Sequence, residues 1–161
     1  MTTLKPKKIL LSVVCIILAI SFCGCTENFN IIQETTNVVN FVADATELTV
    51  LLSDTTLTDQ QKIDLVNDTL FHKNAKCSID SILNDIENSD RFPAPSNGFS
   101  FDIVSIPEPT EIVSSLKYDE ELGGNTYTAT MGISINSVAV SVEVILLSDA
   151  SGLGIYDYEI K

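Results

Sequence analysis

The apolar positions along the chain follow two different periods, and the change falls near residue 90. Before it, apolar residues recur at steps of three and four, which is the period of an amphipathic helix. After it, apolar and polar residues alternate, which is the period of a half-buried strand. Residues 88–98 between the two parts are rich in Asp, Asn, Pro and Gly, the residues of turns. The pattern therefore predicts a helical half followed by a sheet.

Three helices are predicted between about residues 29 and 89. The first runs from about Phe29 to Ser53 with its apolar stripe at Val38, Phe41, Val42, Ala45, Leu48 and Leu52. The second begins at Thr58, because Thr58 and Gln61 have the spacing of a capping box. Asn74 is the predicted cap of the third helix. The apolar face of that helix consists of Ile79, Ile82, Leu83 and Ile86.

Five strands are predicted between about residues 99 and 160. Alternation places them at about 99–106, 112–118, 126–135, 138–146 and 153–160. The connections are short, whereas parallel strands need crossovers of about a dozen residues, so the sheet should be antiparallel. One face is apolar and the other is rich in Thr and Ser, which indicates that one face is buried and the other is hydrated.

The predicted fold class is α+β, with three amino-terminal helices packed on one face of a five-stranded antiparallel meander. This order of elements is similar to that of the cystatin-like and NTF2-like families, although those families usually have a strand among the helices. The resemblance implies a curved sheet that wraps the helices and often encloses a pocket. Such a pocket would be lined by residues such as Phe99, Phe101, Tyr127 and Met131.

The first 24 residues have the three-part layout of an export signal. Three lysines precede residue 9, an apolar run follows from Ile9 to Phe22, and the small residue Gly24 precedes Cys25. The apolar run is shorter than the roughly 20 residues that span a bilayer. The sequence therefore predicts a signal peptide over residues 1–24 and a single extracytoplasmic domain over residues 25–161.

Gly24-Cys25 at the end of such a signal resembles the lipobox of prokaryotic lipoproteins, including the relaxed forms found in archaea. Phe22 and Cys23 depart from the family pattern, which favours Leu and then a small residue at these places. The resemblance implies cleavage after Gly24 and a diacylglyceryl group on Cys25. Two acyl chains give stable membrane anchoring where one gives marginal binding. The alternatives are an uncleaved amino-terminal anchor and plain secretion.

The predicted leader is basic, whereas the rest of the chain is acidic. The whole chain carries 22 acidic and nine basic residues, a net charge of −13. All the acids follow residue 26, so removal of Lys5, Lys7 and Lys8 leaves six bases and a net charge of −16. Nucleic-acid binding needs clusters of Lys and Arg, so this class of function is excluded. The membrane is the one partner that the sequence predicts, through the lipid on Cys25.

Few residues of the chain could act in catalysis or bind a metal. His72 is the one histidine of the chain. If Cys25 carries the lipid, Cys77 is the one free thiol of the mature chain. The sequence therefore predicts no catalytic residue, no disulfide and no metal site. Three carboxylates, Asp119 to Glu121, precede the Gly123-Gly124 turn, where a solvated turn is a simpler interpretation than a calcium site. Asn67-Asp68-Thr69 matches the N-glycosylation pattern. Tyr156 and Tyr158 lie on one face of the last predicted strand, where they either form a binding surface or cover the sheet.

These observations predict a lipid-anchored cell-surface protein with a binding or structural role, without catalysis and without a cofactor. One alternative is an NTF2-like pocket protein that binds a small hydrophobic ligand, with or without enzymatic activity. A third interpretation is an accessory subunit of a surface complex, which predicts an exposed apolar patch.

Overall fold

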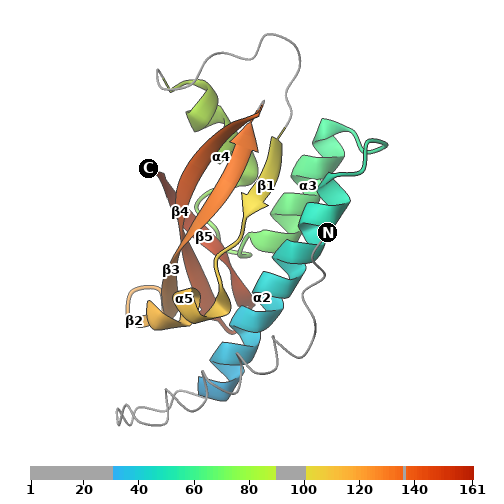
Figure 1. The fold of residues 1–161 in the computed structure, drawn as a ribbon. Helices are drawn as coiled ribbons and strands as arrows, with labels where there is room; N and C mark the ends of the chain where they lie inside the picture. The colour runs from blue at the N-terminus through green and yellow to red at the C-terminus, as the bar shows by residue number, and fades with distance from the viewer. Residues whose placement is uncertain (1–30, 90–100, 136) are drawn as a thin grey trace.

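The computed structural model describes residues 31–89, 101–135 and 137–161, and it forms two layers (Figure 1). Three helices come first: α2 (Ile31–Leu52), α3 (Asp59–Leu70) and α4 (Ile79–Glu87). The remaining elements are β1 (Phe101–Ser105), α5 (Pro109–Ser114), β2 (Lys117–Asp119), β3 (Gly124–Ile135), β4 (Val138–Asp149) and β5 (Gly152–Ile160). The α+β class and the order of helices before an antiparallel sheet are confirmed.

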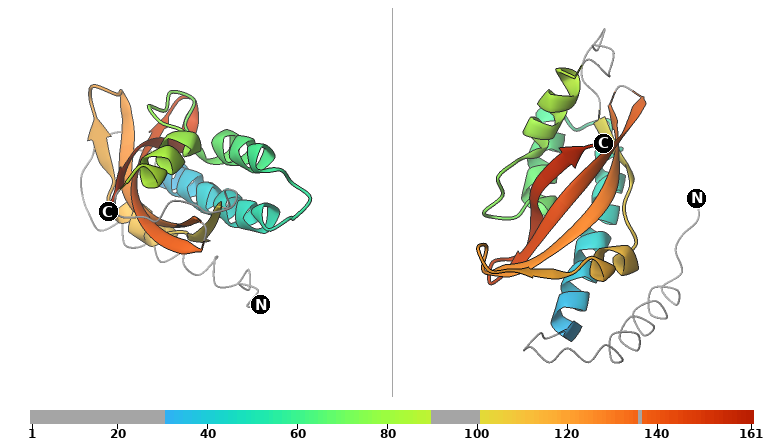
Figure 2. Two further views of the ribbon diagram at one scale, coloured as in Figure 1. Left: turned by 90° about the horizontal axis from the view of Figure 1, so that it is seen from above. Right: turned by 90° about the vertical axis from the view of Figure 1, so that its left-hand side faces the viewer.

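The sheet has the order β1-β3-β4-β5, and β2 pairs with β3. β1 pairs with the end of β3 near Ile135, and β2 pairs with its beginning near Gly124. Hairpins connect β3 to β4 and β4 to β5, whereas β1 and β2 share β3 as their partner. The predicted meander is therefore correct for β2 to β5, which pair in sequence order, and wrong for β1, which pairs with β3 and not with β2. Figure 2 shows the strong twist of these strands.

The segment predicted as the second strand, 112–118, begins inside the helix α5 and is a strand only at its end, in β2, which is a second correction. Pro109 stands in the first turn of α5, where its missing N–H costs nothing and its fixed φ suits the helix. Ile112 is fully buried. The hydroxyl of Ser115 accepts from the Thr128 backbone N–H at 2.8 Å and donates to the Thr128 carbonyl at 2.9 Å. One side chain thus takes the place of a strand partner for this part of β3.

Helix starts follow local capping. The Thr58 hydroxyl accepts from the Gln61 N–H, and the Gln61 side chain accepts from the Thr58 N–H, which confirms the predicted capping box of α3. The third helix begins later than predicted, because its cap is Ser78, with Ser81 completing the box, and not Asn74. Residues 71–77 therefore lie outside both helices and extend along the sheet.

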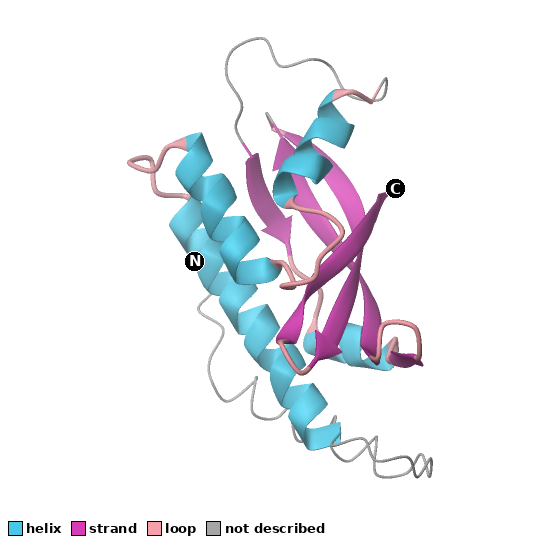
Figure 3. Cartoon of the chain, turned by 180° about the vertical axis from the view of Figure 1, so that it is seen from behind, coloured by secondary structure: helices cyan, strands magenta, loops and turns pink. Residues whose placement is uncertain are grey.

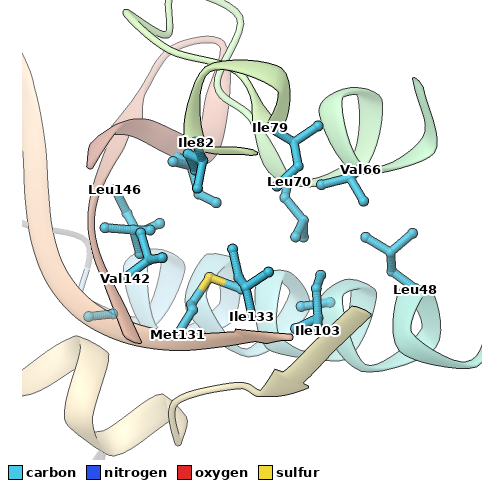
Figure 4. Packing of buried hydrophobic residues seen from close by; sticks show 14 of the residues in the cluster. Leu48, Val66, Leu70, Ile79, Ile82, Ile103, Met131, Ile133, Val142 and Leu146 are labelled. Atoms are coloured by element: carbon cyan, nitrogen blue, oxygen red, sulfur yellow. The ribbon is translucent and has the colours of Figure 1, made fainter. Parts of the chain in front are cut away.

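The core lies between the sheet and the helices (Figures 3 and 4). Helix α2 packs against α3, α5, β1 and β5, and α4 packs against α3 and β5. The alternate residues of β3 and β4 that face the helices are buried, whereas Thr128 and Thr130 on the other face are exposed. Ile82, Leu70, Met131 and Val142 belong to one continuous apolar cluster with residues from all these elements. This alternation is the one predicted from the sequence.

Among the residues that the structure describes, no helix is both long enough and apolar enough to cross a bilayer.

Candidate functional site around His72

His72 lies in the segment that follows α3, and this segment is attached to the edge of β5. The His72 backbone N–H donates to the Ile155 carbonyl at 2.8 Å, and the Lys76 N–H donates to the Tyr156 carbonyl at 2.8 Å. Phe71 forms a parallel bridge to Ile155. Gly154 permits the close approach, because a Cβ there would lie 2.6 Å from the His72 nitrogen. Backbone contacts therefore fix His72 beside the β4–β5 turn.

The imidazole ring of His72 is buried and bonded on both nitrogens. Its side chain is 1% exposed. Nε2 lies 3.1 Å from Oδ1 of Asp149 and 3.1 Å from Oγ of Ser151. Nδ1 accepts from the Asn74 backbone N–H at 3.1 Å. Because an amide N–H can only donate, Nδ1 carries no proton, and the ring is the neutral tautomer with its proton on Nε2.

Asp149 and Ser151 complete this cluster from the β4–β5 turn. Oδ1 of Asp149 accepts from the Ser151 hydroxyl at 2.5 Å and from the Ser151 backbone N–H at 2.6 Å. These two bonds, and then the contact with His72, lower the pKa of Asp149 below its ordinary value. Asp149 is therefore an ionised acceptor that holds both its own turn and the His72 ring.

Ser, His and Asp together suggest a hydrolytic triad, but the connections differ from one. In a triad the carboxylate binds one ring nitrogen and the serine hydroxyl binds the other, which is free to accept the proton. Here Asp149 and Ser151 are both on Nε2, which already carries the proton, and Nδ1 is used by Asn74. The ring therefore has no lone pair directed at Ser151, and the cluster ties the 71–77 segment to the sheet.

Asn67 has a structural role of its own. Its side-chain oxygen accepts from the Ile79 backbone N–H at 2.8 Å, and its nitrogen donates to Asp80 at 3.1 Å. Asn67 on α3 thus satisfies an N–H in the first turn of α4, where helix donors have no partner within the helix. Glycosylation at Asn67 stays a prediction, and a sugar would have to share the side-chain nitrogen with the bond to Asp80.

Cys77 and Asp119, which the sequence offers as a reactive thiol and an ion ligand, both make contacts that support the fold. Cys77 is half-buried, its thiol lies 3.6 Å from the Tyr156 carbonyl oxygen, and burial, with a smaller effect of Asp157, raises its pKa to about 11. Its reactive thiolate form is therefore disfavoured at neutral pH. Oδ1 of Asp119 accepts from the N–H groups of Glu121 and Leu122 within the turn. In the described part of the chain, no group of three or more His, Cys, Asp or Glu residues has the arrangement of a metal site.

The two tyrosines of the last strand contact other parts of the fold, and Tyr156 is 9% exposed. The pairing of β4 with β5 skips Tyr156, which marks a bulge at this residue. Lys76 lies over the Tyr156 ring at 4.9 Å from its centroid. The Tyr158 hydroxyl donates to Asp85 on α4 at 2.5 Å. Both rings cover the junction of β5 with the helical layer.

The residues expected to line a pocket are part of the packed interior. Phe101, Tyr127 and Met131 are 4%, 1% and 3% exposed and belong to the apolar cluster. The Tyr127 hydroxyl donates to Glu34 in the first turn of α2 at 2.5 Å. Burial, and then the Glu34 contact, raises the pKa of Tyr127. Phe99, and likewise Gly24 and Cys25 of the lipobox, lie outside the described residues.

Comparison with protein-family models, with curated proteins and with solved structures finds no significant match to this chain.

Proposed function

We propose that this chain is a lipid-anchored protein of the outer face of the cell membrane, with a binding or structural role and no catalysis. The anchor is supported by the basic and apolar leader that ends in Gly24-Cys25. The non-catalytic role is carried by one observation: the only histidine of the chain is buried and has both ring nitrogens engaged in hydrogen bonds. A histidine that acts as the base for a nucleophile needs an unprotonated ring nitrogen directed at that nucleophile.

The pocket alternative is less well supported than this proposal. It needs space between the sheet and the helices beside Phe101, Tyr127 and Met131, and these three side chains are instead almost fully buried in the apolar cluster. The Tyr127 hydroxyl, the polar group that a ligand would use, is bonded to Glu34.

Metabolic labelling with radioactive lipid precursors tests the anchor. We expect the wild-type protein to incorporate label and the Cys25→Ala variant to incorporate none. Cys23→Ala is the matched control, because it removes the neighbouring thiol and leaves the proposed attachment site. Equal labelling of the wild-type and Cys25→Ala proteins would refute the proposal.

A fluorophosphonate probe, which reacts with activated serines, tests the absence of a hydrolytic site. We expect no labelling of the wild-type protein, because His72 cannot accept the Ser151 proton. Labelling that disappears in both Ser151→Ala and His72→Gln would show that the cluster is catalytic and would refute this half of the proposal.

A further inference from the structure

A lipid on Cys25 would hold one particular end of the domain close to the membrane. Only five residues, 26–30, separate Cys25 from Ile31, the first residue of α2. Six Cα-to-Cα steps span at most about 20 Å when fully extended. This inference rests on the proposed anchor, and it concerns which surface of the domain then faces the lipid.

The length of α2 limits the orientations that such a tether permits. Its 22 residues make it about 33 Å long, so its two ends are further apart than the tether can reach. An orientation with Leu52 directed at the membrane would place Ile31 beyond that reach. The domain must therefore present either the end that carries Ile31 or one of its sides.

Several elements meet at the end that carries Ile31. Helix α5 packs against α2, and β2 pairs with the first residues of β3. The bond between Glu34 and Tyr127 fixes the first turn of α2 to this part of β3. Figure 1 shows the start of α2, α5 and β2 together at the bottom of the molecule. We call the first turn of α2, α5, β2 and the β2–β3 turn the anchor end.

Two large apolar side chains at the anchor end are exposed to solvent. Ile32 is 63% exposed and Tyr118 is 57% exposed, whereas the neighbouring Ile31, Ile112 and Leu122 are buried or partly buried. A tyrosine has an apolar ring and a polar tip, which is the combination enriched at the membrane–water interface. We propose that the anchor end rests on the bilayer surface, with Ile32 and Tyr118 in contact with the headgroup region.

The charge of the anchor end determines which lipid surface it fits. Its carboxylates outnumber its bases, since its one base, Lys117, is opposed by Glu34, Glu111, Asp119, Glu120 and Glu121. An anionic bilayer carries a negative surface potential, which attracts bases and repels these acids. The partner is therefore a zwitterionic or weakly charged surface, and contact with an anionic surface requires salt to screen the repulsion.

The absence of tryptophan from the chain permits a direct test. The lipidated full-length protein is reconstituted into phosphatidylcholine vesicles with brominated acyl chains, which quench tryptophan on close approach. Tyr118→Trp and Ile32→Trp place the probe at the anchor end. Val50→Trp is the matched control, because Val50 is 68% exposed and lies near the far end of α2. Mass spectrometry of the same preparations measures the lipid on Cys25.

We expect quenched, blue-shifted emission from Tyr118→Trp and Ile32→Trp and unchanged emission from Val50→Trp. Replacing half of the lipid by phosphatidylglycerol at low salt should reduce the quenching, and added salt should restore it. With Cys25 lipidated, equal quenching at all three positions, or no quenching at any, overturns the orientation and leaves the anchor in place. An unlipidated Cys25 overturns both.

Discussion

At the scale of single residues, the polar groups in the interior decide how the chain is held together. His72, Asp149 and Ser151 form a closed set of hydrogen bonds between the end of α3 and the β4–β5 turn. A buried polar group that loses its partner costs about 1–3 kcal/mol, which is more than the bond itself contributes when it is made. Removal of one member should therefore affect stability more than its small contact area suggests.

The pH dependence of stability should reveal the role of Asp149. Its pKa is lower in the folded protein than in the unfolded chain, so its contribution is fully present above its ordinary pKa of about 4. That contribution is lost as the pH falls through the lower, folded value. Asp149→Asn should thus be less stable than the wild type at pH 7, with the difference shrinking below pH 4. Urea unfolding of both proteins at pH 7 and below pH 4 measures this difference in the free energy of unfolding.

Glu159→Gln is the control for that experiment, because Glu159 is an exposed acid on the same strand hairpin and pairs with Lys161 at the surface. Exposed pairs contribute about 0–1 kcal/mol. A stability difference between Asp149→Asn and wild type that stays constant from pH 7 to below pH 3 would contradict the assigned role.

At the scale of elements, local signals predicted most of the fold. The period of α2 and the Thr58–Gln61 box depend on residues within one or two turns, and the structure has both as predicted. The alternation of β3, β4 and β5 is equally local. The period of two at Ile112, Ser114 and Leu116 predicts a strand over 112–118, but only its last residues form one, because Pro109 starts a helix that runs to Ser114.

The contacts that sequence could not predict join distant positions. His72 is the one histidine of the chain, and nothing local in the sequence pairs it with Asp149, which is 77 positions away. Asn67 likewise matches a glycosylation pattern in the sequence. Its hydrogen bond with Ile79 depends on the packing of α3 against α4, which no local pattern indicates. The cap of α4 is Ser78 and not Asn74 because of contacts with a distant strand. Backbone hydrogen bonds to β5 hold residues 72 and 76 in place.

The role of Asn67 can be separated from glycosylation by two substitutions. Asn67→Ala removes the bond to the Ile79 N–H and should lower the free energy of unfolding by about 1–2 kcal/mol, the usual effect of losing a helix cap. Thr69→Ala destroys the acceptor pattern and leaves Asn67 in place, and Thr69 is exposed. Chemical denaturation should therefore distinguish the variants. Equal stability of Asn67→Ala and Thr69→Ala would show that Asn67 does not support α4.

The attachment of the 71–77 segment to β5 depends on the absence of a side chain at residue 154. A Cβ there would lie 2.6 Å from the His72 nitrogen and 2.8 Å from its Cα, both backbone atoms that cannot move independently. Gly154→Ala should destabilise the protein by about 1–3 kcal/mol, as overpacking does. It should also speed hydrogen exchange of the His72 and Lys76 amides, which donate to β5.

Gly123→Ala is the comparison for this variant. Gly123 has φ +65° with open space around its Cβ position, so the cost there is conformational, about 1 kcal/mol, and the amides of residues 72 and 76 should keep their protection. If Gly154→Ala exchanges these amides no faster than Gly123→Ala, the segment does not depend on the close approach.

At the scale of the whole molecule, charge repulsion should oppose folding more than ion pairs support it. The predicted mature chain carries six bases against 22 acids. Lys161 pairs with Glu143 at 3.3 Å and with Glu159 at 2.7 Å, and both pairs are solvent-exposed. The compact state concentrates the excess negative charge, and added salt screens it within a Debye length of about 10 Å at 0.1 M.

The melting temperature should therefore rise as sodium chloride increases from 10 to 200 mM. Surface pairs would weaken over the same range, but their contribution is about 0–1 kcal/mol each, whereas the excess of acids acts over the entire surface. The His72 ring is neutral, so its contacts with Asp149 and Ser151 are hydrogen bonds, and their contribution should change little with salt. Calorimetry at constant pH measures the shift, with Lys161→Ala as the variant in which the pairs with Glu143 and Glu159 are absent. A melting temperature that falls with salt in the wild type, and stays constant in Lys161→Ala, would show that ion pairs outweigh the repulsion.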